Sequence, residues 1–305
     1  MKKFIMYTAV FLLAIATNLS AFDSAILETM LQVDCQLEQL DRSANKHDHH
    51  DNHHNKQKDY DYQQRIDGVG TSLHAPSNSE THAAGVGSTN WSGYVAVTNL
   101  QHPGTGTVTD VSGSWAVPSV LPSTIHTYSS FWVGIDGYSD GTVEQIGTEH
   151  DYVPGQGQVN YAWFEMYPQG AYLIVGFPVK AGDLMGAEVS YVSKNTFQLT
   201  LINYTKHLYT IIPHSYTQST TALRSSAEWV AEAPSSSQGV LPLADFQHGL
   251  FSNCQATING KTGSITNSHW ADTSIIMETV GGTLKAVPSS TTSSGSTFIV
   301  SWDHS

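Results

Sequence analysis

Short apolar stretches separated by turn-forming residues dominate the chain from Gly85 onward. Runs rich in Val, Ile, Thr, Tyr, Phe and Trp alternate there with clusters of Gly, Pro, Ser, Asn and Asp, a pattern typical of β-strands joined by turns. Many short strands without intervening helices predict an all-β fold, an antiparallel sandwich or barrel. The expected strands are Ser92–Thr98, Thr107–Val117, Ser129–Ile135, Val143–Thr148, Val159–Tyr167, Tyr172–Val175, Met185–Val192, Phe197–Asn203, Leu208–Ile212, Ser226–Ala231, Leu243–His248, Cys254–Ile258, Ser274–Thr279, Leu284–Val287 and Thr297–Trp302.

The strand expected around Glu228 has two unlike faces. Successive side chains of a strand point to opposite sides, so Ser226–Glu232 places Trp229 and two alanines on a face suited to a core. The opposite face carries Glu228 and Glu232, and carboxylates seldom lie on a covered face unless it lines a wet groove. A solvent-facing strand with two ordinary glutamates explains the same pattern, so both interpretations stay open at this point.

Two further strands repeat this division, and a glutamine lies close by. Aromatic side chains give contact area with a polar handle, and convergent carboxylates are candidates for acid–base chemistry. Gln145 lies near Gly147, and a strand glycine lets a ligand or another backbone approach closely. These residues would line a binding groove, or else lie on the outer, solvent-facing surface of a sandwich. The second faces of the two strands hold Trp132, Gly134 and Asp136, and Tyr161, Trp163, Glu165 and Tyr167.

The first residues carry the features of an export signal. Two lysines precede the mostly apolar run Phe4–Ala16, and the small residues Ser20 and Ala21 come after it. This order predicts a cleaved signal peptide over residues 1–21, because the apolar run is too short to span a bilayer comfortably. The mature protein is therefore expected to be exported, either secreted or periplasmic.

Residues 22–84 differ in composition from the rest of the chain. Apolar residues recur at roughly helical spacing from Phe22 to Leu40, and the polar run His47–Asn55 comes next. Residues 56–84 have few apolar side chains and no steady period, which favours disorder. This order predicts a His-rich, partly disordered prosegment ahead of a folded domain over residues 85–305. The histidine run itself has three open interpretations: a transition-metal site, a pH switch or a solvated linker.

Charge and cysteine content indicate which partners and which environment the protein is suited to. The chain has 13 basic and 26 acidic residues, a formal net charge of −13, and such a field repels nucleic acid and anionic lipid. Scarce lysine beside abundant Ser and Thr suits work at low pH, where carboxylates lose their charge. With only Cys35 and Cys254, no disulfide framework is expected. The two cysteines either pair or leave Cys254 as a small buried side chain.

Some familiar hydrolase motifs are missing from the sequence. There is no His-Glu-x-x-His zinc helix and no Asp-Thr-Gly of the usual aspartic peptidases; Asp272-Thr273-Ser274 comes nearest to the latter and has no second copy. A Ser/His/Asp triad stays open, because its members need not be adjacent in sequence. A cysteine nucleophile is disfavoured, since Cys254 lies in an expected strand.

Six short segments together resemble the glutamic peptidase family, also called eqolisins or peptidase family G1. They occur in the family's order and cover most of residues 90–260. The segments are Asn90-Trp91-Ser92-Gly93-Tyr94, Gly113-Ser114-Trp115-Ala116-Val117-Pro118, Trp132-Val133-Gly134-Ile135-Asp136-Gly137, Glu144-Gln145-Ile146-Gly147, Trp163-Phe164-Glu165-Met166-Tyr167-Pro168 and Ser226-Ala227-Glu228-Trp229-Val230-Ala231-Glu232.

This resemblance implies a fold, a site and a reaction. The fold would be a concanavalin-like or jelly-roll-like sandwich of two antiparallel sheets, with substrate on the concave face of one. An ionised Glu228 would take a proton from a bound water that attacks a peptide carbonyl, while Gln145 holds the water and stabilises the developing oxyanion. Asp136 would orient the Gln145 amide. The implied site is the catalytic pair Gln145 and Glu228, with Trp132, Asp136, Trp163 and Glu165 binding or orienting around it.

The same resemblance implies an acid-acting endopeptidase without a metal or cofactor. Its partners would be polypeptide substrates and its own prosegment as inhibitor, with no nucleic acid or membrane, and the protein would be a monomer. The chain departs from the family where Ile146 follows Gln145 in place of Thr, and where Ala233-Pro234 follows the Glu228 strand in place of an aromatic residue. These departures affect the expected subsites more than the chemistry.

Two other functions stay open on the sequence. A jelly-roll glycoside hydrolase would use two carboxylates, Glu228 with Glu165 or Glu149. A non-catalytic sandwich that binds sugar or protein would use none of them for chemistry. Replacement of Gln145 separates the first from a peptidase, and replacement of Glu228 separates the second.

Overall fold

The computed structural model describes residues 56–64, 81–82, 85–215 and 221–305, and the regular elements in these ranges are all strands. They belong to one compact unit, His54–Ser305, and the all-β prediction is confirmed. In this described part, no helix is long and apolar enough to cross a membrane. The predicted signal peptide, the helix over residues 22–40 and the histidine run over 47–55 lie outside the described residues.

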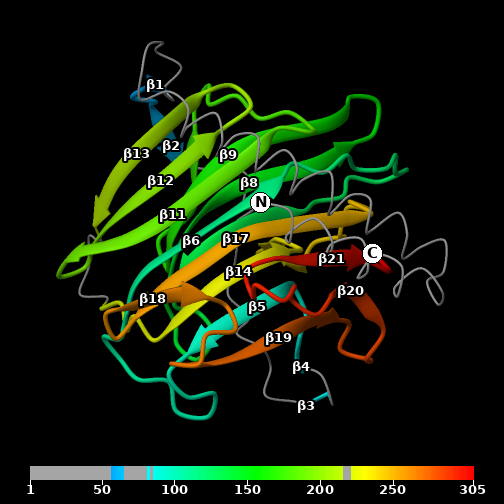
Figure 1. Ribbon diagram of the computed structural model, residues 1–305. Helices are drawn as coiled ribbons and strands as arrows, with labels where there is room; N and C mark the ends of the chain where they lie inside the picture. Colours follow the sequence, from blue (N-terminus) through cyan, green and yellow to red (C-terminus); the bar gives the residue numbers. More distant parts are fainter. Residues whose placement is uncertain (1–55, 65–80, 83–84, 216–220) are drawn as a thin grey trace, which may run out of the picture. The chain divides into compact units, whose positions relative to one another are not determined.

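One layer, which we call the site sheet, carries the strands around Glu228 (Figure 1). Its central strand β14 (Ser226–Glu232) pairs with β5 (Trp91–Val97) on one side and β7 (Ser130–Ile135) on the other. Both of these pairs are antiparallel. Among the described strands of this sheet, the one parallel pair is β19 with β4. The sheet continues past β7 through β8 (Val143–Val153), β9 (Gly157–Tyr167) and β10 (Tyr172–Ile174), and past β5 through β19 (Ala271–Glu278) to β4 (Gly85–Ser88).

The second layer, which we call the back sheet, is built on β6 (Val108–Ala116). It joins the site sheet along one side, because β20 (Leu284–Pro288) pairs with both β19 and β21. The other strands of the layer are β17 (His248–Ile258), β21 (Phe298–Trp302), β11 (Leu184–Ser193), β12 (Thr196–Asn203) and β13 (Leu208–Ser215). The short strand β18 (Lys261–Ser264) pairs with β17 of this layer. Outside it, β3 (Thr81–His82) pairs with β4 of the site sheet, and β15 (Ser235–Ser236) with β16 (Gly239–Val240) forms a separate two-stranded sheet.

The two layers share one core, into which β14 sends its apolar side chains. Ala227, Trp229 and Ala231 are fully buried there, as their alternation predicted. The indole Nε1 of Trp229 donates to the backbone oxygen of Ser112 at 2.7 Å, which ties β14 to β6 of the back sheet. A Cβ atom on Gly113 would lie 2.9 Å from the same indole, so this crossing requires glycine. The glutamates of β14 consequently point away from the core.

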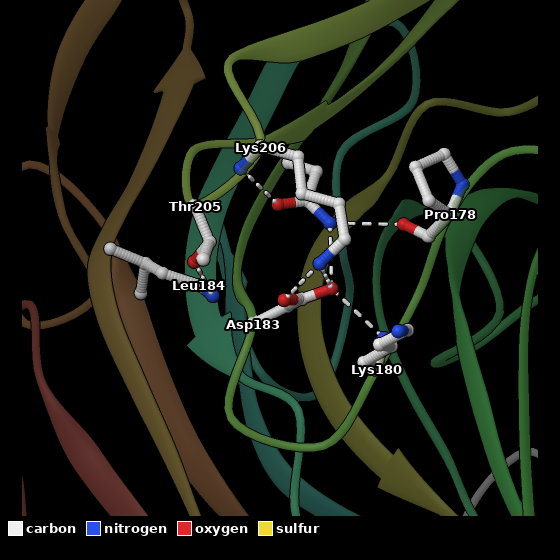
Figure 2. A network of polar contacts seen from close by, with 7 residues as sticks. Pro178, Lys180, Asp183, Leu184, Thr205 and Lys206 are labelled. Atoms are coloured by element: carbon white, nitrogen blue, oxygen red, sulfur yellow. Dashed lines mark hydrogen bonds and ion pairs between the residues drawn. The ribbon is translucent and has the colours of Figure 1, made fainter.

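A buried carboxylate fixes two turns of the back sheet (Figure 2). Asp183, in the loop before β11, accepts from the Lys206 ammonium at 2.5 and 2.7 Å and from the Lys180 backbone at 2.9 Å. The Asn203 amide also donates to Asp183, at 2.9 Å, and to the backbone oxygen of Pro178 at 2.9 Å. The Lys206 charge and these amides satisfy a carboxylate that burial would otherwise destabilise, and the network holds the β12–β13 turn against the β10–β11 loop.

Near β17, one predicted strand is absent and one strand was not predicted. The segment Leu243–Gln247 is irregular, with only an isolated bridge between Leu243 and Tyr128, and β17 begins at His248; the apolar residues of the segment are buried, but in a loop. Strand β18 was not expected because its residues are polar. It follows Asn259-Gly260, whose φ angles of 52° and 70° make the two-residue turn that joins β17 to β18. That dipeptide was the hairpin signal in the sequence.

Three short strands lie in the stretch 56–84, which was expected to be mostly disordered. They are β1 (Lys56–Gln57), on the edge of β13, β2 (Tyr62–Gln64), on the edge of β10, and β3 (Thr81–His82), on β4. The composition of this stretch is polar, but the edges of both sheets supply hydrogen bonds that composition does not reveal. In the described part of the chain Cys254 is a free thiol, fully buried in β17, and Cys35, the other cysteine, lies outside that part.

Candidate active site

Glu228, Gly134 and Gln145 lie in one row on the outer face of the site sheet. Glu228 of β14 is opposite Gly134 of β7, and Gly134 is opposite Gln145 of β8. The row continues to Glu165 of β9. Adjacent strands are about 4.8 Å apart, so two strand spacings, about 10 Å, separate the Cα atoms of Glu228 and Gln145. Two long side chains at this separation can meet above the glycine between them.

Gly134 lets neighbouring side chains approach the backbone between Glu228 and Gln145 closely. A Cβ atom at this position would lie 2.9 Å from Cζ3 of Trp132 and 3.2 Å from Cβ of Gln145. The indole of Trp132 and the Gln145 side chain therefore bound the space directly above the glycine. Sequence reasoning placed Gly134 on the same face as Trp132 but gave it no role; its position between two site strands is the signal that was available.

Glu165 orients the Gln145 amide. Nε2 of Gln145 donates to Oε2 of Glu165 at 2.8 Å, between residues that are directly opposite in the β8–β9 pair. Both side chains are only 1% exposed, so solvent competes little with this bond. The sequence analysis expected Asp136 to orient the Gln145 amide, and this stays a prediction; the acceptor that the structure shows for one of the two amide hydrogens is Glu165.

Asp136 instead holds the segment that leads into β14. It follows β7 with a φ of 71°, in the left-handed region, where aspartate is tolerated better than most residues. Its carboxyl oxygens accept from the backbone N–H groups of Arg224 and Ser225, each at 2.6 Å. Burial, with the charge of Asp140 nearby, raises the pKa of Asp136 to about 7. Asp136 therefore positions the strand that carries Glu228.

Glu228 is a buried acid. It is 0% exposed, and neither of its carboxyl oxygens has a hydrogen-bond partner within 3.5 Å among the described residues; the Ser226 hydroxyl is nevertheless near enough to lower the pKa of Glu228 in part. Burial raises the pKa of Glu228 well above its usual value, and the carboxyl groups of Asp136, Asp140 and Glu144 raise it further. A buried polar group without a partner is unusual in a folded protein, and strongly shifted carboxyl groups are typical of catalytic sites.

Two tryptophans form the next row of the same face. Val230 of β14 is opposite Trp132 of β7, which is opposite Gly147 of β8, which is opposite Trp163 of β9. Both indoles are fully buried and belong to a second apolar cluster, separate from the sandwich core. The structure therefore brings together five of the six predicted site residues on one face, with Asp136 at its end.

Glu232, which the prediction left out of the site, anchors one of these indoles. Nε1 of Trp132 donates to Oε2 of Glu232 at 2.8 Å, and the side-chain amide of Asn90 donates to Oε1 at 3.0 Å. Glu232 is fully buried, and this burial raises its pKa to about 8. The signal in the sequence was its position on the Glu228 face, four residues further along β14.

Other catalytic groups are not supported by the geometry. Gly137-Tyr138-Ser139-Asp140-Gly141 fits the Gly-x-Ser-x-Gly spacing of serine hydrolases, which requires a strand–turn–helix elbow. Here it connects the antiparallel strands β7 and β8, so Ser139 lacks the geometry of a nucleophile. In the ranges that the structure describes, no group of three or more His, Cys, Asp and Glu residues is placed to hold a metal ion.

The fold is a β-sandwich, and the row of Glu228, Gly134 and Gln145 lies on the outer face of one of its sheets. A model of the Peptidase A4 family matches residues 89–302, well over half of the chain, and the chain therefore belongs to that family. The resemblance to glutamic peptidases that the six segments indicated is confirmed.

Individual relatives agree with this assignment. Aspergillopepsin-2 of Aspergillus niger is 29% identical over 197 residues, which are 57% of this chain and 66% of the relative, just under two thirds of its length. The crystal structure of aspergilloglutamic peptidase from Aspergillus niger has a TM-score of 0.52 at 28% identity, over 58% of this chain and 99% of that one. A scytalido-glutamic peptidase structure has a TM-score of 0.57 at 24% identity, over 70% of this chain and 98% of that one, which shows a shared fold.

Proposed function

We propose that this protein is an acid-acting endopeptidase in which Gln145 and Glu228 activate a water molecule to hydrolyse peptide bonds. The observation that carries the proposal is the row in which Glu228 and Gln145 flank a glycine on the outer face of the site sheet. Membership of a peptidase family and the relatives named above support the reaction class.

The proposed chemistry needs only these two groups and a water. Ionised Glu228 takes a proton from the water as its oxygen attacks the substrate carbonyl, and later gives that proton to the leaving amine. One N–H of the Gln145 amide is held by Glu165, and the second stabilises the carbonyl oxygen as it becomes negative. A donor placed in this way is typically worth about 3 kcal/mol of transition-state stabilisation. Trp132 and Trp163 supply the apolar surface along which an extended polypeptide lies.

Burial of the site supports activation by processing. In the full chain Glu228 is 0% exposed and Gln145 is 1% exposed, so a substrate reaches them only after the site is uncovered. The same burial raises the pKa of Glu228, and a raised pKa favours the protonated carboxyl group, which is not a base. Uncovering rehydrates Glu228 and lowers its pKa into the range of acid catalysis. Residues 22–84 are proposed as the inhibitory prosegment.

The remaining assignments of this proposal come from the sequence. Residues 1–21 direct export, so the enzyme works outside the cytoplasm, secreted or periplasmic. The working form is a monomer that acts on polypeptides without a metal or cofactor. The net charge of −13 argues against nucleic acid or anionic membrane as partners.

Glycoside hydrolysis is less well supported by the geometry. A two-carboxylate mechanism would pair Glu228 with Glu165, but Gln145 lies between them in the row and is hydrogen-bonded to Glu165. A pairing with Glu149 would span two rows of the sheet, because Glu149 is opposite Ser130 and Tyr161.

Processing and chemistry can be tested on one preparation. Purified full-length protein brought to about pH 4, where ordinary carboxylates begin to protonate, is expected to shorten to a species that starts near residues 80–90 and digests a denatured protein. Glu228→Gln is expected to remain full-length and inactive. Full-length protein that persists without activity would contradict processing, and sugar hydrolysis that survives Gln145→Ala would favour the glycosidase alternative.

A further inference from the structure

Residues Lys56–Gln64 lie outside the family-matched domain and are nevertheless bonded to both of its sheets. The match to the family begins at residue 89, whereas β1 and β2 precede it by more than twenty positions. Sheet edges carry unpaired backbone groups that bind further strands readily. The segment therefore pairs with two edge strands of the domain, β13 and β10, although the segment itself lies outside the residues that match the family.

On the back sheet, β1 adds a strand beside β13. Lys56 and Gln57 pair in parallel with Leu208 and Tyr209. The Lys56 backbone N–H donates to the His207 oxygen at 2.8 Å, and the Lys58 N–H donates to the Tyr209 oxygen at 3.0 Å. Both bonds use main-chain groups, so this contact depends on extended conformation more than on side-chain identity.

On the site sheet, β2 adds a strand beside β10. Tyr62–Gln64 pairs antiparallel with Tyr172–Ile174, and the Val175 N–H donates to the Asp61 oxygen at 2.7 Å. Gln64 is opposite Tyr172, which is opposite Phe164 of β9. Phe164 directly precedes Glu165, so the chain leaves β2 two strands away from the strand that carries Glu165.

Two tyrosines of the segment add side-chain contacts to these ladders. Tyr60 packs against the sandwich core and meets Phe177 edge to face, with ring centroids 5.1 Å apart. Tyr62 meets Phe164 edge to face at 5.3 Å and Tyr172 at 5.7 Å. Aromatic pairs in these geometries are worth about 0.5–1.5 kcal/mol each beyond their buried area. The tyrosines thus give the segment preferred positions on the two edges.

We propose that the β10 and β13 edges form a strand-accepting docking surface whose occupant is the chain's own segment Lys56–Gln64. The segment runs from the β13 edge of the back sheet to the β10 edge of the site sheet. Docking does not depend on the peptidase mechanism. Its role as the anchor of an inhibitory prosegment does rest on the proposed function.

An anchor of this kind raises the local concentration of the residues attached to it. Effective concentrations through short linkers reach the millimolar range, so a weak inhibitory contact made by residues on either side of the segment would still be occupied. After a cut between residues 65 and 84, the segment is held only by the contacts described here. It then leaves the domain at a rate that its own docking sets.

Amide hydrogen exchange measured by mass spectrometry on the full chain at neutral pH tests the docking directly. Peptides covering residues 56–62 and 172–175 are expected to exchange at least about tenfold more slowly than unstructured peptides. In the double variant Tyr60→Ser, Tyr62→Ser, residues 56–62 should lose this protection and residues 172–175 should lose the part that β2 supplies, since β10 still pairs with β9; Tyr62→Phe, which keeps the ring, should retain it. Peptides of β14 serve as the internal control for an intact fold.

The contradicting result is equally clear. Exchange of residues 56–62 at the rate of an unstructured peptide in the wild-type chain would overturn the docking surface. Protection of residues 172–175 that is unchanged in the double variant would show that the segment does not cover β10. Since neither readout involves catalysis, failure of the docking is distinguishable from failure of the proposed peptidase function.

Discussion

Gln145 donates its side-chain amide to Glu165 at 2.8 Å, across directly opposite positions of β8 and β9. The bond uses one of the two N–H hydrogens of a buried amide and thereby fixes the direction in which the second hydrogen points. In an acid-acting site this arrangement has an advantage, because an amide does not titrate and keeps its donors at any pH. The catalytic role proposed for Gln145 therefore depends on Glu165.

Replacement of Glu165 tests this dependence. Glu165→Leu should lower kcat by about tenfold or more, because it leaves a buried amide hydrogen without its acceptor. Glu165→Gln keeps an acceptor oxygen at the same place and should retain most of the activity. Steady-state kinetics on a peptide substrate separate kcat from KM. Equal losses in both variants would mean that the charge of Glu165, and not its hydrogen bond, matters.

Gly134→Ala tests the space between Glu228 and Gln145. The added methyl group would lie 2.9 Å from the Trp132 indole and 3.2 Å from Cβ of Gln145, so it should abolish most activity and cost about 1–3 kcal/mol of stability. Gly141→Ala is the matched control, because a Cβ atom there meets nothing within 4 Å. Full activity in Gly134→Ala would contradict a water held at this place.

Buried carboxyl groups predict that the protein is most stable in acid. Burial raises the pKa of Glu232 to about 8 and that of Asp136 to about 7, above their unfolded values near 4. The folded state then binds more protons than the unfolded state between these limits, so the stability that these two groups contribute is fully present below about pH 4 and is lost as the pH rises through 7–8. Thermal melting between pH 4 and pH 9 measures this loss.

Glu232→Gln isolates one part of that dependence. A neutral amide resembles the protonated acid, so the variant should lose less stability than wild type between pH 5 and pH 9, by up to a few kcal/mol. It still accepts from Trp132 with its amide oxygen. Identical pH dependence in the two proteins would show that Glu232 does not carry a raised pKa.

His150 acts in the opposite direction. It is fully buried in β8, with Nε2 2.8 Å from the Thr148 hydroxyl, and burial lowers its pKa to about 3. Unfolding lets it bind a proton near pH 6.5, so this residue destabilises the fold progressively as the pH falls from 6.5 to 3. His150→Gln should therefore raise the melting temperature, relative to wild type, more at pH 4 than at pH 7. An equal shift at both pH values would contradict a neutral buried histidine.

The outer face of the site sheet could be predicted from alternation alone. Because side chains of a strand alternate, Trp132, Trp163, Glu165 and Glu228 separated correctly from their core-facing neighbours. The bond between Gln145 and Glu165 could not be predicted in this way, since it depends on the register of β8 with β9, which no local pattern specifies.

Residues beyond the strand ends were the hardest to predict. Asp136 was assigned to the site face by extending the β7 alternation one position too far; its positive φ turns it toward Arg224 and Ser225. The docked segment Lys56–Gln64 was missed for a related reason. Its strands exist only where sheet edges from distant parts of the chain are available, so its polar composition indicated disorder.

The most direct test of the proposed catalytic pair is the pH–rate profile of the processed enzyme on a denatured protein or peptide, with Glu228→Gln and Gln145→Ala measured beside wild type. The account predicts activity centred in the acid range, with losses of at least about a hundredfold in kcat for each variant. Wild-type activity in either variant would contradict a Gln145–Glu228 pair that activates water.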